Sequence, residues 1–134
     1  EELFQKDSNT FKAAKEIITR HPNKQITVVA DESGSKRKTS ASETDYEILR
    51  RANLHVVNFR NPRVKDRYNN LNRLFETGQI IIDPKCKKLI EDLEKLVYDN
   101  SNDMLSHASD ALGYLAWHLF PMKKPTRAGK ITYR

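Results

Sequence analysis

The sequence predicts an α/β fold with a parallel βαβ unit at its centre, on three observations. Two short runs rich in β-branched residues, Ile26–Ala30 and Leu54–Phe59, are typical of strands, and the first is apolar enough to be buried on both faces. A loop and an amphipathic helical segment separate them, a connection too long for a hairpin. The second half of the chain shows the three-four spacing of helices. A central sheet flanked by helices is therefore expected.

Local signals place the helices of the first half. Asn9 or Thr10 can cap a helix that ends before the break at "HPNK". A second helix, extending to about Ala52, is expected to be capped by Ser42, with Asp45 three residues later in the spacing of a capping box. The polar stretch between the first strand and this helix has no hydrophobic period and is predicted to be a loop.

Three further helices are expected in the second half, over residues 64–76, 85–98 and 106–120. Pro121 ends the last of them. His107 and Asp110 lie three residues apart in its opening turn, on a stripe beside the apolar face. The expected buried face consists of Ala108, Ala111, Leu112, Leu115, Ala116 and Leu119.

Composition favours an anionic partner. The chain of 134 residues carries a formal charge of +6, which favours nucleic acid without requiring it. Its single cysteine, Cys86, lies on an apolar stripe, so it is expected in the core, and disulfides and multi-cysteine zinc sites are excluded. A reducing, intracellular setting fits, and no membrane-spanning stretch is present. A glycine-rich phosphate loop and a G-x-S-x-G elbow are absent.

Asp31 is the first candidate for chemistry, because it directly follows the first predicted strand and so lies at the carboxyl edge of the sheet, where ligands bind in open α/β folds. If the last helix packs with its first turn at this edge, Asp110 and His107 can face Asp31. Carboxylates with a helping imidazole suit Mg²⁺ or Mn²⁺. The simpler alternatives are an Asp that starts a turn and an Asp that favours a helix N-terminus.

Basic residues follow both strand ends, on the same edge as Asp31. They could be a solvated surface, or they could hold phosphates without reading sequence. The candidates for duplex DNA binding are Lys36, Arg37 and Lys38 after the first strand, and Arg60, Arg63, Lys65 and Arg67 after the second. Tyr114 and Trp117 are expected to pack in the core rather than to stack on bases.

Three stretches resemble the C-terminal nuclease domain of the large terminase subunit of tailed bacteriophages and prophages. "ITVVADESGS" is similar to the strand that ends in the second metal-binding aspartate, here Asp31. "HASDALGYLAWHLF" resembles the closing helix, where His-x-x-Asp supplies the last acidic ligand, here Asp110 with His107 beside it. The residues 64–99 between them resemble the family's helix, short strand and helix. The resemblance covers roughly residues 1–120.

This resemblance implies an RNase H-like fold and a metal-dependent endonuclease that cuts concatemeric duplex DNA during genome packaging. Asp31 and Asp110 would be catalytic metal ligands, and His107 an auxiliary ligand or proton-transfer group. The implied cofactor is Mg²⁺ or Mn²⁺, with two ions in the complete domain. The implied partners are double-stranded DNA, the small terminase subunit and the portal, in the cytoplasm of the bacterial host and away from membranes.

One departure from the family concerns the opening strands. The family's domain begins with antiparallel strands, the first of which carries the first catalytic aspartate. Residues 1–121 are therefore expected to form a nuclease domain that lacks these strands, with a basic tail at 122–134. Two carboxylates are also few for a two-ion site.

Two other interpretations stay open: a non-catalytic α/β module that binds DNA or a partner protein of the motor, and a small α/β domain with an unrelated ligand. If the two carboxylates repel each other without metal, Asp110→Asn should keep the fold and slightly stabilise the metal-free protein.

Overall fold

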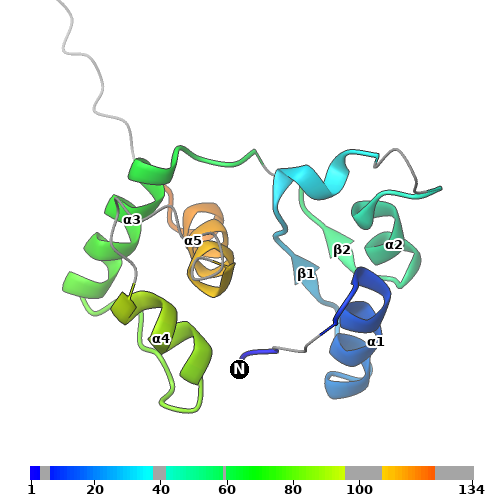
Figure 1. Cartoon of the computed structure of the whole chain (residues 1–134), viewed down its shortest axis with the longest axis horizontal. Helices are drawn as coiled ribbons and strands as arrows, with labels where there is room; N and C mark the ends of the chain where they lie inside the picture. Colours follow the sequence, from blue (N-terminus) through cyan, green and yellow to red (C-terminus); the bar gives the residue numbers. More distant parts are fainter. Residues whose placement is uncertain (4–6, 38–41, 59, 96–106, 123–134) are drawn as a thin grey trace, which may run out of the picture.

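The computed structural model describes residues 1–3, 7–37, 42–58, 60–95 and 107–122. These residues form helices and a small sheet, which confirms the α/β class (Figure 1). In chain order the elements are α1 (Thr10–Arg20), β1 (Thr27–Val28), the 3₁₀ helix η1 (Glu32–Ser35), α2 (Asp45–Arg51), β2 (His55–Val56), α3 (Val64–Glu76), α4 (Lys87–Lys95) and α5 (His107–Leu119).

The two strands form the predicted parallel βαβ unit. β1 and β2 pair in parallel, with Thr27 opposite His55 and Val28 opposite Val56, and α2 lies between them in the chain. The sheet packs on α1 and α2. The buried residues of this core are Ala14, Tyr46, Leu49, Leu54 and Val56.

Both strands are shorter than expected, and β1 is not buried on both faces. Thr27 is exposed and Val28 is half-buried. The reason is that β1 has a strand on one side only, because the sheet in the described part of the chain has two strands. The expected second strand ended at Phe59, which lies outside the described residues.

The helix caps agree with expectation at α1 and differ at α2. The Asn9 side chain accepts a hydrogen bond from the backbone N–H of Lys12 and caps α1. For α2 the expected cap at Ser42 is wrong, because Thr44 and Glu47 satisfy each other's backbone N–H groups in a complete capping box.

The remaining helices form a second core beside the sheet. α3 has the predicted bounds, whereas α4 is shorter than expected at its start, and residues 96–98 lie outside the described chain. α5 packs on both α3 and α4. Leu71, Leu74 and Ala116 are buried there. Residues 79–83, where the resemblance implied a short strand, form none, and Ile81 is 91% exposed.

The buried face of α5 differs from the one expected. Ala111, Leu115 and Leu119 are exposed, whereas the buried residues are Ser109, Gly113, Tyr114 and Ala116. Small side chains face α3 because a long arginine from that helix fills the space over Gly113. In Figure 1, α5 lies between α3 and the sheet, and its Tyr114 hydroxyl donates a hydrogen bond to Asp31, which follows β1. No helix in the described ranges is long and apolar enough to cross a membrane.

Candidate functional site

Asp31 lies at the carboxyl end of β1 and is fixed by hydrogen bonds from η1, from α5 and from the loop after β2. It caps η1, with Oδ1 accepting from the backbone N–H of Ser33 at 2.7 Å. Oδ2 accepts from the Tyr114 hydroxyl of α5 at 2.9 Å and from the Asn61 amide at 3.3 Å. The carboxylate that sequence placed at the sheet edge is therefore also bound to the last helix.

These contacts favour the charged form of Asp31. Burial alone would raise its pKa, but the hydrogen bonds from Ser33, Tyr114 and Asn61 together outweigh burial and lower the pKa. For Tyr114, burial and the hydrogen bond it donates to Asp31 raise the pKa to about 12. Around neutral pH the pair is thus a carboxylate and a neutral phenol that donates to it.

The loops that follow β1 and β2 are joined side by side. The backbone N–H of Glu32 donates to the Asn61 side-chain oxygen at 3.0 Å, and the backbone N–H of Asn61 donates to the Glu32 carboxylate at 3.2 Å. Because parallel strands end at the same edge, this reciprocal pair fixes both loops there. Asn61 thereby supports Asp31 from the second strand.

Asp110 belongs to the first turn of α5 and is held by a buried arginine. Its Oδ1 accepts a hydrogen bond from Nη2 of Arg67 in α3, and the two groups form an ion pair. The Arg67 side chain is 5% exposed and that of Asp110 is 25% exposed. The guanidinium carbon also lies 4.6 Å from the centre of the Tyr114 ring. Contacts therefore run from Asp110 through Arg67 and Tyr114 to Asp31.

The first turn of α5 is also positioned by α4. Asp92, which is 7% exposed, accepts a hydrogen bond from the backbone N–H of Ala108 at 2.9 Å. A carboxylate at a helix N-terminus satisfies an unpaired N–H and complements the helix dipole. His107 begins the same turn and is exposed.

One cavity of about 190 Å³ brings the three sequence-predicted residues together. Asp31 contributes from the strand side, and His107 and Asp110 contribute from the helix side. The rest of the lining comes from Val29, Ala30, Ala111 and Tyr114. The helix residues 107, 110, 111 and 114 lie on one face at helical spacing, which explains why they meet β1 together.

The basic residues divide into an exposed group and one buried residue. Five of the expected DNA-binding side chains are exposed: Lys36, Arg37, Arg60, Arg63 and Lys65. Lys38 lies outside the described residues. The expectation for Arg67 is wrong in one respect, because this residue is 4% exposed and paired with Asp110 rather than facing solvent.

Sequence reasoning assigned Arg67 to DNA binding and Tyr114 to packing, and it did not single out Asn61. A signal existed for Arg67, which precedes Leu71 by four residues and Leu74 by seven, on the core face of its helix. Tyr114 likewise follows Asp110 by four residues. No local pattern distinguishes Asn61.

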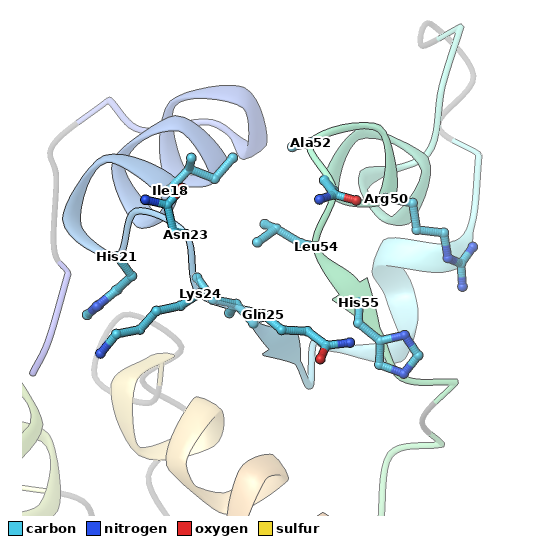
Figure 2. A pocket seen from close by; sticks show the side chains of 11 residues that line it. Ile18, His21, Asn23, Lys24, Gln25, Arg50, Ala52, Leu54 and His55 are labelled. Carbon is cyan, nitrogen blue, oxygen red and sulfur yellow. The ribbon is translucent and has the colours of Figure 1, made fainter.

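A larger cavity, of about 790 Å³, lies at the opposite ends of the strands and has a different character. In Figure 2, His21 and Lys24 lie on one side of it and Arg50 and His55 on the other, with Leu54 between them. Its polar groups do not converge on one point, unlike those of a ligand site.

The carboxylates at the smaller cavity suit a hard cation, although the set is small. Asp110 Oδ2 has no hydrogen-bond partner among the described residues, and the carboxylate of Asp31 has lone pairs beyond its three bonds. Mg²⁺ is commonly held by one or two carboxylates, with waters and substrate phosphates completing its shell. Within the described ranges, no group of three or more His, Cys, Asp or Glu side chains is placed to hold a metal.

Residues 2–118 match the model of a family described as the terminase RNase H-like domain. No curated protein and no solved structure matches the chain. Because the family match extends over most of the sequence and agrees with an α/β chain with a parallel strand pair, the chain belongs to the terminase RNase H-like domain family.

Proposed function

We propose that this chain provides the metal-dependent endonuclease activity of a viral DNA-packaging terminase, which cuts concatemeric duplex DNA. One observation carries the proposal: in a member of this family, Asp31, Asp110 and His107 line one cavity although they are far apart in the sequence. Carboxylates that converge at the carboxyl end of parallel strands suit phosphodiester chemistry, because ligands of open α/β sheets bind at this end.

The residues at this cavity would have three roles: metal binding, proton transfer and orientation of a carboxylate. Asp31 and Asp110 would hold Mg²⁺ or Mn²⁺, which supplies an activated water and stabilises the charge that develops on phosphate oxygens. His107, exposed at the rim, would accept or donate a proton or add a ligand atom. Tyr114 and Asn61 would keep the Asp31 carboxylate oriented through the hydrogen bonds described above.

The DNA would lie against the loops that follow the two strands. Asp31 is followed by η1, and Lys36 and Arg37 come directly after η1. After β2, Arg60 precedes Asn61 and Arg63 follows it by two residues. These exposed cations can contact phosphates next to the cavity without contacting bases. Binding should therefore depend on salt and hardly on sequence.

A second ion would need more carboxylates than the described residues bring to the cavity. The outer edge of β1 has no strand partner in the described sheet. We propose that a further strand at this edge completes the domain and brings another carboxylate, as expected for a two-ion site.

The test is a plasmid-cleavage assay with Mn²⁺ or Mg²⁺, run on the chain and on the full product of its gene. Asp31→Asn and Asp110→Asn should each abolish cleavage, because Asn keeps the shape but loses the charge that holds a cation. The matched control is Asp83→Asn, since Asp83 is exposed and lies outside the cavity. EDTA should stop cleavage by the wild type.

Cleavage that persists in either site variant would contradict the proposal. DNA binding without any metal-dependent cleavage by the full gene product would favour a non-catalytic binding module instead.

A further inference from the structure

Arg67 is a buried cation in contact with both sides of the candidate site. Its guanidinium pairs with Asp110 and lies 4.6 Å from the centre of the Tyr114 ring. The hydroxyl of that tyrosine donates to Asp31 at 2.9 Å. One positive charge is therefore linked directly to one candidate metal ligand and, through one ring, to the other.

The surroundings of Arg67 hold it in this place. A Cβ at Gly113 would lie 2.6 Å from both Cγ and Cδ of Arg67, so glycine leaves room for the arginine stem. Tyr68 provides a second ring, 5.5 Å from the guanidinium carbon. Asp110 is the one carboxylate paired with Arg67 in the described residues, and Nε of Arg67 is buried there without a hydrogen-bond partner. A buried charge with a single ion-pair partner depends strongly on that partner.

We propose that Arg67 is a positioning residue that holds Asp110 and supplies the positive charge that allows Asp31 and Asp110 to line one cavity before a divalent cation binds. The consequence for binding follows from Coulomb's law: a fixed positive charge beside Asp110 opposes an arriving cation and lowers the affinity of the site. The lowered affinity for a cation rests on the proposed metal site. The compensation of the Asp110 charge by Arg67 in the metal-free protein does not.

The first experiment measures Mn²⁺ affinity by titration with detection of free Mn²⁺ by electron paramagnetic resonance. Arg67→Met removes the charge and keeps an unbranched stem, so it should bind Mn²⁺ about tenfold more tightly than the wild type. Arg67→Lys keeps the charge and should stay within about twofold of the wild type. A purely structural role predicts weaker or unchanged binding in Arg67→Met, and that result would overturn the proposal.

The matched control is Arg73→Met. Arg73 lies on the same helix and also contacts α5, but it donates to the backbone oxygen of Phe120 at the far end of that helix. Its loss lowers the net charge equally and should leave Mn²⁺ affinity unchanged within about twofold. Equal tightening in Arg67→Met and Arg73→Met would show a general charge effect and would also overturn the proposal.

The second experiment needs no metal and covers the case in which Arg67→Met folds poorly. Urea unfolding is compared for Arg67→Met, Asp110→Asn and the double variant, with EDTA present. The double variant should be at least as stable as either single variant, because it leaves no unpaired charge. Destabilisations that simply add in the double variant would show that Arg67 acts by packing alone.

The two experiments separate the two proposals. If the wild type binds no Mn²⁺ while the double variant recovers stability, the metal site fails and the charge compensation stands. If the wild type binds Mn²⁺ and loses it in Asp31→Asn, but Arg67→Met binds no more tightly, the metal site stands and the role of Arg67 fails.

Discussion

The two sides of the cavity hold their aspartates by different means. On the strand side, Asp31 accepts hydrogen bonds from neutral donors on Ser33, Asn61 and Tyr114. On the helix side, Asp110 is paired with the buried charge of Arg67. A hydrogen bond to a charged group contributes about 1.5–3 kcal/mol, whereas removing one partner of a buried ion pair costs about 3–5 kcal/mol. The same substitution should therefore have unequal effects on the two sides.

The largest expected effect is on stability. Asp110→Asn should lower the free energy of unfolding of the metal-free protein by about 3 kcal/mol, because Arg67 keeps its charge without a counter-ion. Asp31→Asn should cost about 2 kcal/mol, because one amide oxygen still accepts a hydrogen bond while the amide nitrogen replaces the other accepting oxygen. Urea unfolding in EDTA measures both.

This prediction reverses the sequence-based expectation for Asp110→Asn. Repulsion between two carboxylates would make the neutral variant slightly more stable, but that reasoning did not include the ion pair with Arg67. Asp83→Asn, at an exposed position, provides the control. Equal losses at positions 31 and 110 would remove the distinction between the two sides.

A second prediction concerns the exposed basic residues beside Asp31 and their contribution to duplex binding. The Lys36→Ala/Arg37→Ala variant, beside Asp31, should weaken duplex binding about tenfold at low salt and reduce its dependence on salt, because phosphate contacts are lost. Fluorescence anisotropy on two unrelated duplexes measures this. The control is Lys88→Ala/Lys95→Ala on α4, where both lysines are already paired with Glu91. Equal weakening by the control, or loss on only one duplex, would contradict the proposed DNA face.

How far the sequence predicts this molecule depends on how local each feature is. The βαβ order, the Asn9 cap and the bounds of α3 follow from spacing within a few residues, and all three are found. The strands were expected to be longer because their residues are apolar enough to be buried. An apolar run does not show whether a neighbouring strand is present, and the described sheet has two strands.

The candidate site could be predicted from the sequence only where its residues carry a local signal. Asp31, His107 and Asp110 stand out because each begins or ends an element, and the structure places them at one cavity. The spacing of Arg67 places it on the core face of its helix, but the room for its side chain depends on Gly113, which is 46 residues away in the chain and adjacent in space. Contacts of that kind arise from the packing of α3 on α5, which no local pattern reports.

A third prediction concerns the bond that joins the two sides. Tyr114→Phe removes the hydroxyl that donates to Asp31 and keeps the ring that faces Arg67. Unfolding experiments should show a loss of about 1.5 kcal/mol, with Mn²⁺ affinity changed less than by Arg67→Met. A loss of stability as large as that of Asp110→Asn would mean that the hydroxyl bond to Asp31 stabilises the fold as much as the ion pair between Arg67 and Asp110.

The smallest expected effect is a difference in pH dependence at Asp31. Its pKa in the folded chain is lowered below the ordinary value near 4, because hydrogen bonds from Ser33, Tyr114 and Asn61 outweigh burial. A lowered folded pKa means that the charged group stabilises the fold above the unfolded pKa, and that this contribution disappears as pH falls through the folded pKa. The stability difference between wild type and Asp31→Asn should therefore be constant from about pH 7 to pH 5 and should shrink below about pH 4. Urea unfolding over this range tests it, because the other acidic groups are common to both proteins and cancel in the difference. A difference that grows on acidification would mean that burial outweighs the hydrogen bonds, and that the strand side does not favour a charged carboxylate.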